Sequence, residues 1–120
     1  MTRFAYAPAM AWTTLCTVDD LWKGLGKYAE IDGYRLAIFY DTDNDRVSVT
    51  DDSCPHAGAP MSDGVVNSGC AVCPMHGWAF DLQTGALRGS GSELPVLRVY
   101  ESRILEENGK RFVQAVLPMP

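Results

Sequence analysis

The chain has 120 residues, of which ten are basic and fifteen acidic, and its formal net charge at pH 7 is −5. This length fits one domain with its own core, and the acidic balance argues against a nucleic-acid partner, which would need a basic surface. No apolar run reaches the roughly 18 residues of a membrane span, and no secretory signal is evident in residues 1–11, so we expect a cytoplasmic protein without membrane contact. We expect residues 1–11 to form a flexible tail and residues 12–120 to form a single domain.

Short strands separated by turns are predicted along most of the chain. Thr17-Val18-Asp19-Asp20 resembles a helix-capping sequence, and Asp32-Gly33 supplies the positive φ values that a tight hairpin turn requires. Alternation of polar and apolar residues and the turn signals between them predict strands over residues 12–17, 27–31, 34–40, 46–50, 78–82, 85–88, 96–104 and 112–117. About eight to ten short strands with little helix indicate an all-β antiparallel sandwich or barrel.

Two short segments carry the chemistry of the chain. Cys54-Pro55-His56 and Cys73-Pro74-Met75-His76 contain its only two histidines, and sixteen residues separate the two segments. Each segment falls in a loop that leaves a strand, and each offers one thiolate and one imidazole. Two thiolates and two imidazoles form a metal-ligand set, and it is the set found at a Rieske [2Fe–2S] centre.

A zinc site is the alternative interpretation of the same residues. A finger-type zinc site pairs Cys with Cys across about two to four residues and His with His across about three to five, unlike the mixed pairs here. Cys70-Ala71-Val72-Cys73 is nevertheless a Cys-x-x-Cys, so Cys54, Cys70, Cys73 and one histidine could hold zinc in a non-redox module. We expect Cys70 instead to be a small buried residue on the strand that enters the second loop, and Cys16 to be a core residue.

The sequence resembles the Rieske [2Fe–2S] ferredoxin family at Cys54-x-His56 and Cys73-x-x-His76, and the similarity extends over about residues 12–117. The resemblance implies a Rieske-type antiparallel β-sandwich with a cluster-binding subdomain made of two loops. It implies one [2Fe–2S] cluster per chain, with Cys54 and Cys73 on the buried iron and His56 and His76 on the exposed iron. Family members usually cover the cluster with a proline-rich third loop, which in this chain is the glycine- and serine-rich segment 89–95, so we expect a more mobile cover.

The resemblance also bears on the reduction potential. High-potential members of the family carry an extra cysteine in each loop, and these form a disulfide; they also carry a Ser and a Tyr after the second histidine that donate to the sulfurs. Ala59 and Met75 stand at the extra-cysteine positions here, and Trp78 and Phe80 stand where the hydroxyls would be. Fewer donors to sulfur leave the reduced state less stabilised, so we expect a potential of about −150 mV, near the low end of the Rieske range.

A stand-alone Rieske domain implies an electron carrier, or a subunit of an oxidoreductase, with no catalytic residues of its own. The segments 12–16, 18–21, 36–40 and 97–103 resemble the small subunit of an assimilatory NAD(P)H nitrite reductase, the context we favour. The alternative is the ferredoxin component of an aromatic-ring-hydroxylating dioxygenase. The implied partners are a flavin reductase or an NAD(P)H-dependent large subunit as donor, and a terminal reductase or oxygenase as acceptor.

Overall fold

The structure is a computed structural model that describes residues 12–55, 58–75, 77–88 and 96–118. Strands make up most of this part of the chain, together with two short 3-10 helices, η3 (Val18–Asp20) and η4 (Met61–Asp63). The strands are β1 (Trp12–Thr17), β2 (Lys27–Ile31), β3 (Tyr34–Asp41), β4 (Arg46–Asp51), β5 (Val65–Asn67), β6 (Cys70–Val72), β7 (Ala79–Asp81), β8 (Val99–Tyr100), β9 (Ser102–Glu107) and β10 (Lys110–Val116). The described residues contain no α-helix, and all strand pairs are antiparallel, which confirms the predicted all-β class.

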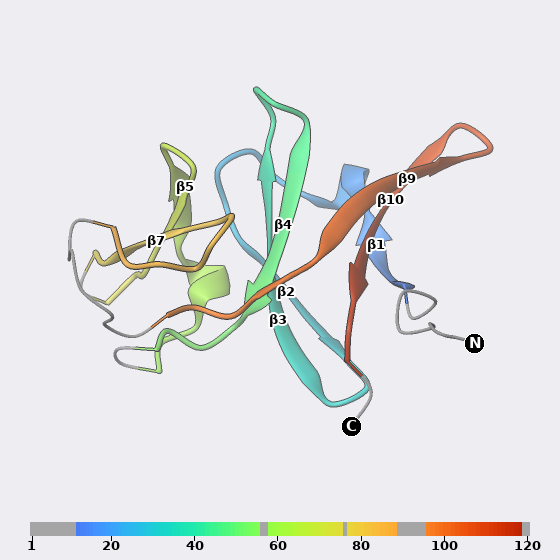
Figure 1. Ribbon diagram of the computed structural model, residues 1–120. Coiled ribbons are helices and arrows are strands. Elements are labelled where there is room, and N and C mark those ends of the chain that lie inside the picture. The colour runs from blue at the N-terminus through green and yellow to red at the C-terminus, as the bar shows by residue number, and fades with distance from the viewer. Residues whose placement is uncertain (1–11, 56–57, 76, 89–95, 119–120) are drawn as a thin grey trace, which may run out of the picture.

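The strands form three sheets, ordered β1-β10-β9, β2-β3-β4-β8 and β5-β6-β7. In Figure 1 the strands β2, β3 and β4 occupy the middle of the molecule, with β1, β9 and β10 on one side and β5 and β7 on the other. The small β5-β6-β7 sheet carries the second of the two cysteine segments. The four-stranded sheet therefore lies between the β1-β10-β9 sheet and the small β5-β6-β7 sheet.

Strand β3 is buried on both faces and separates two apolar cores. Side chains of a strand point alternately to opposite faces: Leu36 and Ile38 face one core, and Ala37 and Phe39 face the other. The first, which we call the scaffold core, contains Val18, Leu21, Leu36, Ile38, Val47, Val49, Tyr100, Val113, Ala115 and Leu117. The second, which we call the loop core, contains Ala37, Phe39, Cys54, Ala59, Met61, Ala71, Cys73, Phe80, Leu82 and Leu97. The unbroken apolar run of β3 thus follows from burial on both sides.

The first half of the chain folds as the sequence predicts. Strands β1 and β2 have the predicted bounds, and β3 and β4 each extend one residue further. The capping sequence also forms, because the Thr17 side chain and the Asp20 carboxylate cap η3 reciprocally. Asp32 and Gly33 both have positive φ in the turn between β2 and β3, as the hairpin signal requires.

Two strand predictions in the second half were wrong. Residues 85–88 do not form a strand; Leu87 makes one isolated bridge to Phe80, and Gly85 turns instead against Leu97, whose N–H donates to the Gly85 carbonyl at 2.9 Å. Residues 96–104 do not form one strand either. The chain leaves the four-stranded sheet at Glu101, so β8 and β9 pair in different sheets.

The expected tail, residues 1–11, lies outside the described residues, as does the cover segment 89–95. The single domain over 12–120 stays a prediction. Within the described ranges, no helix has the length and apolar character needed to cross a membrane.

Candidate metal centre

The two cysteines predicted to be ligands lie at the edge of the loop core. Cys54 follows β4, and Cys73 follows β6, so each begins a loop that leaves a strand. Their exposed fractions are 2% and 1%, and both pack in the loop core. None of the four cysteines of the chain is in a disulfide. Two thiols from different sheets are therefore buried in one apolar cluster.

The loops that follow these cysteines are closed by the same backbone hydrogen bonds. The Cys54 N–H donates to the carbonyl five residues later, on Ala59, at 2.8 Å, and the Cys73 N–H donates to the equivalent carbonyl of Trp78 at 2.8 Å. The glycine four residues after each cysteine donates its N–H to the carbonyl of that cysteine. The distance is 2.7 Å from Gly58 to Cys54 and 3.0 Å from Gly77 to Cys73.

The residues that flank the two loops also pair with each other in the same way. Ser53 bridges Pro60 across the first loop, and Val72 pairs with Ala79 across the second. The two loops are therefore equal in length and closure, although one histidine follows its cysteine by two residues and the other by three.

A glycine with positive φ completes each loop. Gly58 has a φ of 73° and Gly77 a φ of 71°, values in the left-handed region that glycine adopts without steric cost. This conformation lets each glycine N–H turn back toward its cysteine carbonyl. This pair of glycines was not predicted, although both stand four residues after a predicted ligand cysteine.

Cys70 faces away from the loop core. Along β6, Ala71 and the following Cys73 contact the loop core, so the alternation of side chains places Cys70 on the opposite face. Its neighbours there include Asp81 and Arg88, and burial raises the pKa of its thiol. Cys70 is 1% exposed on β6, which confirms that it is a buried residue of the strand entering the second loop. That it is not a metal ligand stays a prediction.

Cys16 lies far from both loops in the sheet order. It sits on β1, pairs with Val113 and packs against the scaffold core. Burial is the main cause that raises the pKa of the Cys16 thiol, to about 11. A protonated thiol at this position is consistent with a core role.

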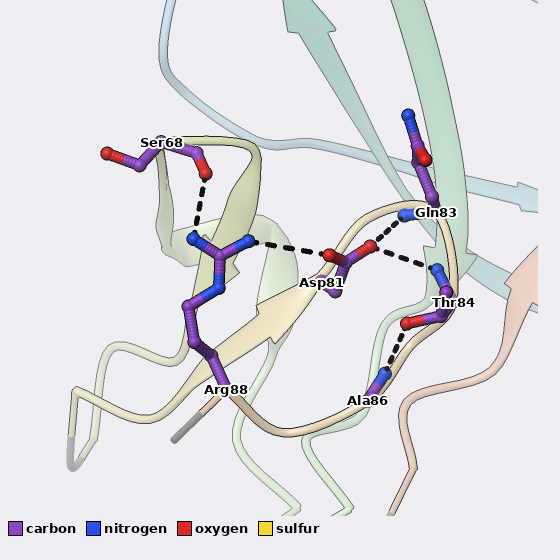
Figure 2. A network of polar contacts seen from close by, with 6 residues as sticks. All are labelled: Ser68, Asp81, Gln83, Thr84, Ala86 and Arg88. Atoms are coloured by element: carbon purple, nitrogen blue, oxygen red, sulfur yellow. Dashed lines mark hydrogen bonds and ion pairs between the residues drawn. The ribbon is translucent and has the colours of Figure 1, made fainter.

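A polar network fixes the turn that follows β7 (Figure 2). The Asp81 carboxylate accepts from the N–H groups of Gln83 at 2.7 Å and Thr84 at 3.1 Å, and the Thr84 hydroxyl accepts from the Ala86 N–H at 3.1 Å. Arg88 joins this turn to the β5–β6 turn: its guanidinium donates to the Ser68 carbonyl at 3.2 Å and to Asp81 at 3.4 Å. The backbone donors, led by that of Gln83, lower the pKa of Asp81. The network links the β5–β6 turn to the end of β7, at the end of the three-stranded sheet opposite the second loop.

Close backbone contacts also fix the approach to Cys73. A Cβ at Gly64 would lie 2.0 Å from the carbonyl oxygen of Val72, the residue before Cys73, so only glycine fits there. Met61 and Leu97, which were not predicted as core residues, are 0% and 1% exposed in the loop core. Met61 begins the short helix η4, and Leu97 lies before β8 rather than in a strand, so neither position follows from a periodic pattern.

The residues predicted to tune the site occupy contrasting environments. Phe80 is fully buried in the loop core, and Trp78 packs against that core. Ala59 is buried as well, whereas Met75 is 62% exposed. His56 and His76 lie outside the described residues, and within the described part of the chain no three His, Cys, Asp or Glu side chains group as metal ligands. The donor set present, two buried thiols on equivalent loops, fits a cluster that takes one thiolate from each loop.

Comparison with known proteins identifies the class to which this fold and these loops belong. Residues 11–101 match the Rieske [2Fe-2S] domain, so the chain belongs to the Rieske [2Fe–2S] domain family, as the sequence predicted. Membership in this family implies a [2Fe–2S] cluster.

Three relatives illustrate the range of proteins that share this domain. A structure from Mycobacterium tuberculosis, assigned as the small subunit of an NADH-dependent nitrite reductase, is 27% identical with a TM-score of 0.75, covering 90% of this chain and 96% of that one. A ferredoxin bound to the oxygenase in carbazole 1,9a-dioxygenase is 27% identical with a TM-score of 0.65, covering 84% of this chain and 99% of that one. The cholesterol 7-desaturase of Hemicentrotus pulcherrimus is 33% identical over 105 residues, which are 82% of this chain but 22% of that protein. The domain thus occurs both in small chains and as part of longer proteins.

Proposed function

We propose that this chain transfers single electrons through a [2Fe–2S] cluster held by Cys54 and Cys73 on one iron and His56 and His76 on the other. The observation that carries the proposal is the equivalence of the two loops, each of which begins at a buried cysteine in the loop core. Each loop also contains one of the two histidines of the chain. When bound, such a cluster supplies one-electron redox chemistry.

The charge of the ligand set favours reduction at moderate potential. Two ferric ions and two sulfides carry +2, so two thiolates give an oxidised site of zero charge, whereas four thiolates would give −2. Rieske potentials accordingly span roughly −150 to +300 mV, above the roughly −400 mV of plant-type ferredoxins.

The residues around the second loop support a potential at the low end of that range. Phe80 and Trp78 bring apolar rings to the second loop where hydroxyl donors stand in high-potential relatives. Met75, which is exposed, and Ala59, which is buried, stand where the two cysteines of the extra disulfide would be. We expect a midpoint near −150 mV; a potentiometric titration with a strongly positive midpoint would overturn this assignment.

The favoured context is the small subunit of an assimilatory NAD(P)H nitrite reductase. Its support is the likeness to the Mycobacterium tuberculosis structure, which covers nearly the whole of both chains. The donor would be an NAD(P)H-dependent large subunit. Co-purification with a large siroheme subunit, and its reduction of this chain with NAD(P)H, test this context.

The second context is the ferredoxin of an aromatic-ring dioxygenase. Its support is the likeness to the carbazole 1,9a-dioxygenase ferredoxin, which was solved bound to its oxygenase. Here the donor would be a flavin reductase and the acceptor an oxygenase. Rapid reduction by a dioxygenase reductase, with no affinity for a siroheme subunit, would favour this context over the first.

Metal analysis separates both contexts from a zinc module. Protein isolated without oxygen should contain iron and inorganic sulfide and should give a rhombic Rieske-type EPR signal after dithionite. A colourless protein with stoichiometric zinc would overturn the proposal of electron transfer.

A further inference from the structure

An apolar row of side chains crosses the outer face of the small β5-β6-β7 sheet, which forms one flank of the molecule (Figure 1). Val66, Ala71 and Phe80 lie opposite one another in these strands and pack in or against the loop core. Because side chains alternate between the two faces of a strand, the neighbours of these residues point away from the core. The outer row consists of Val65, Val72 and Ala79, which pair with one another across the strands.

The segment before β2 extends this row at the edge of β5. Leu25 forms an isolated antiparallel bridge with Val65. The Leu25 N–H donates to the Trp22 carbonyl at 3.3 Å, and Gly24 has a φ of 74°, so a tight turn brings Trp22 close to Leu25. The five apolar residues that result form what we call the apolar stripe: Trp22, Leu25, Val65, Val72 and Ala79.

The outer end of the apolar stripe is open to solvent. Trp22 is 70% exposed, and Leu25 and Val65 are each 43% exposed. The adjoining row of the same face is covered instead, because Cys70 there is 1% exposed and the Arg88 side chain reaches across the sheet toward the β5–β6 turn. The described residues therefore leave the outer end of the stripe uncovered.

The inner end of the apolar stripe borders the second loop. Val72 directly precedes Cys73 and pairs with Ala79 across the base of that loop. Leu25 and Val72 lie on either side of β5, so two strand spacings, roughly 10 Å, separate them. A protein that binds the stripe is therefore held beside the loop that begins at Cys73.

The apolar stripe carries no charge, and the charges beside it are of both signs. Lys27 and Asp20 line one small cleft together with Trp22. Lys23 lines a second cleft with the carboxylates of the β3–β4 turn. Because neither sign dominates the surroundings, contact at the stripe depends on apolar burial rather than on charge.

The size of the exposed surface favours a transient partner over a permanent dimer. The side chains of Trp22, Leu25 and Val65 present roughly 200–300 Å² of apolar surface to solvent. A stable interface takes about 800 Å² from each partner, whereas smaller contacts are typical of weak electron-transfer encounters. A second copy bound permanently through this surface is therefore disfavoured.

We propose that the apolar stripe is the docking surface for a redox protein that exchanges electrons with this chain and that meets it with an apolar, uncharged surface. The inference rests on the proposed function, because it requires a redox centre beside the second loop. It goes further by placing the contact on the outer face of the small sheet, with Trp22 as its anchor. Tryptophan is enriched among the few interface residues that carry most of the binding free energy.

The test is calorimetric titration of the chain, at low and at high ionic strength, with one purified probe for each context. The probes are the siroheme large subunit of an NAD(P)H nitrite reductase and the flavin reductase of an aromatic-ring dioxygenase. Trp22→Ser should weaken binding of the probe that recognises the parent by about 30-fold, the loss typical of a tryptophan hot spot. The affinity of the parent should change little with salt. Tyr28→Ser is the matched control, because Tyr28 is 45% exposed but lies on β2, outside the stripe, and it should leave the affinity unchanged.

Unchanged affinity in Trp22→Ser, an equal loss in Tyr28→Ser, a steep fall of affinity with salt, or no association with either probe overturns the proposal. Sedimentation of the chain alone tests the other occupant: a dimer of the parent that is lost in Trp22→Ser assigns the stripe to a second copy and also overturns it. Circular dichroism and iron content of each variant exclude loss of the fold or of the cluster. Parent protein without iron would refute the proposed function while its association with the probes could still be measured, so the two failures are distinguishable.

Discussion

Replacing the loop glycines by alanine tests whether the two loops are equivalent. Gly58 and Gly77 have φ values of 73° and 71°, and a Cβ at either meets no described atom within 4 Å. The penalty is therefore backbone strain alone, about 1–2 kcal/mol for a non-glycine residue in the left-handed region. Because each glycine N–H closes its loop onto the cysteine carbonyl, this strain should raise the population of the open loop about 5–30-fold in both variants.

The matched control is Gly109→Ala. Gly109 has a φ of 80° with no described atom near a Cβ, but it lies in the turn between β9 and β10, away from the loops. The assay follows bleaching of the visible absorbance by an iron chelator, which reports local opening when opening precedes metal loss.

Gly58→Ala and Gly77→Ala should bleach about 5–30-fold faster than the parent, and Gly109→Ala should bleach at the parent rate despite a similar loss of global stability. Asparagine, which tolerates the left-handed region, should give a smaller effect than alanine at either loop glycine. Equal bleaching in Gly109→Ala, or no acceleration in the loop variants, would refute the reasoning.

Three further predictions follow from the described contacts. Cys73→Ser should lose the cluster absorbance, whereas Cys70→Ser, on the opposite face of β6, should keep it; a colourless Cys70→Ser protein would show that the ligands are wrongly chosen. Tyr100→Phe should lower the free energy of unfolding in urea by about 1–2 kcal/mol, because a hydrogen bond to a charged group is lost and water replaces it at half-exposed Asp51; an unchanged urea midpoint would contradict this. Burial raises the pKa of Cys16 from 9.0 to about 11, so the unfolded chain loses this proton first and stability should fall as the pH rises through that window; the decline should be shallower in Cys16→Ala, and an identical pH profile would count against it.

The predictable parts of this fold have local causes. The hairpin of β2 and β3 follows from Asp32-Gly33, and the short η3 follows from the Thr17 and Asp20 capping pair. The cysteines predicted to be ligands also stand out in the sequence, because a metal site needs donors at short spacing. Their burial in one apolar core agrees with that interpretation.

The features that the sequence did not predict depend on contacts between distant segments. Strand β5 (Val65–Asn67) is too short for a periodic signal and forms because Gly64 lets the chain pass close to Val72. Residues 85–88 follow the turn at Gln83-Thr84 and were predicted to be the second strand of a hairpin, but Gly85 turns against Leu97. The break at Glu101 is a change of sheet, which no local pattern encodes.

The central claim, that one cysteine and one histidine from each loop hold a two-iron cluster, is tested most directly by metal analysis and EPR on a single preparation. Protein isolated without oxygen should contain iron and sulfide in equal amounts, two of each per chain, and should show a rhombic Rieske-type signal after reduction with dithionite. Replacing either histidine, His56 or His76, with alanine should abolish both results. Zinc in place of iron, or an EPR signal that survives both histidine substitutions, would contradict the account.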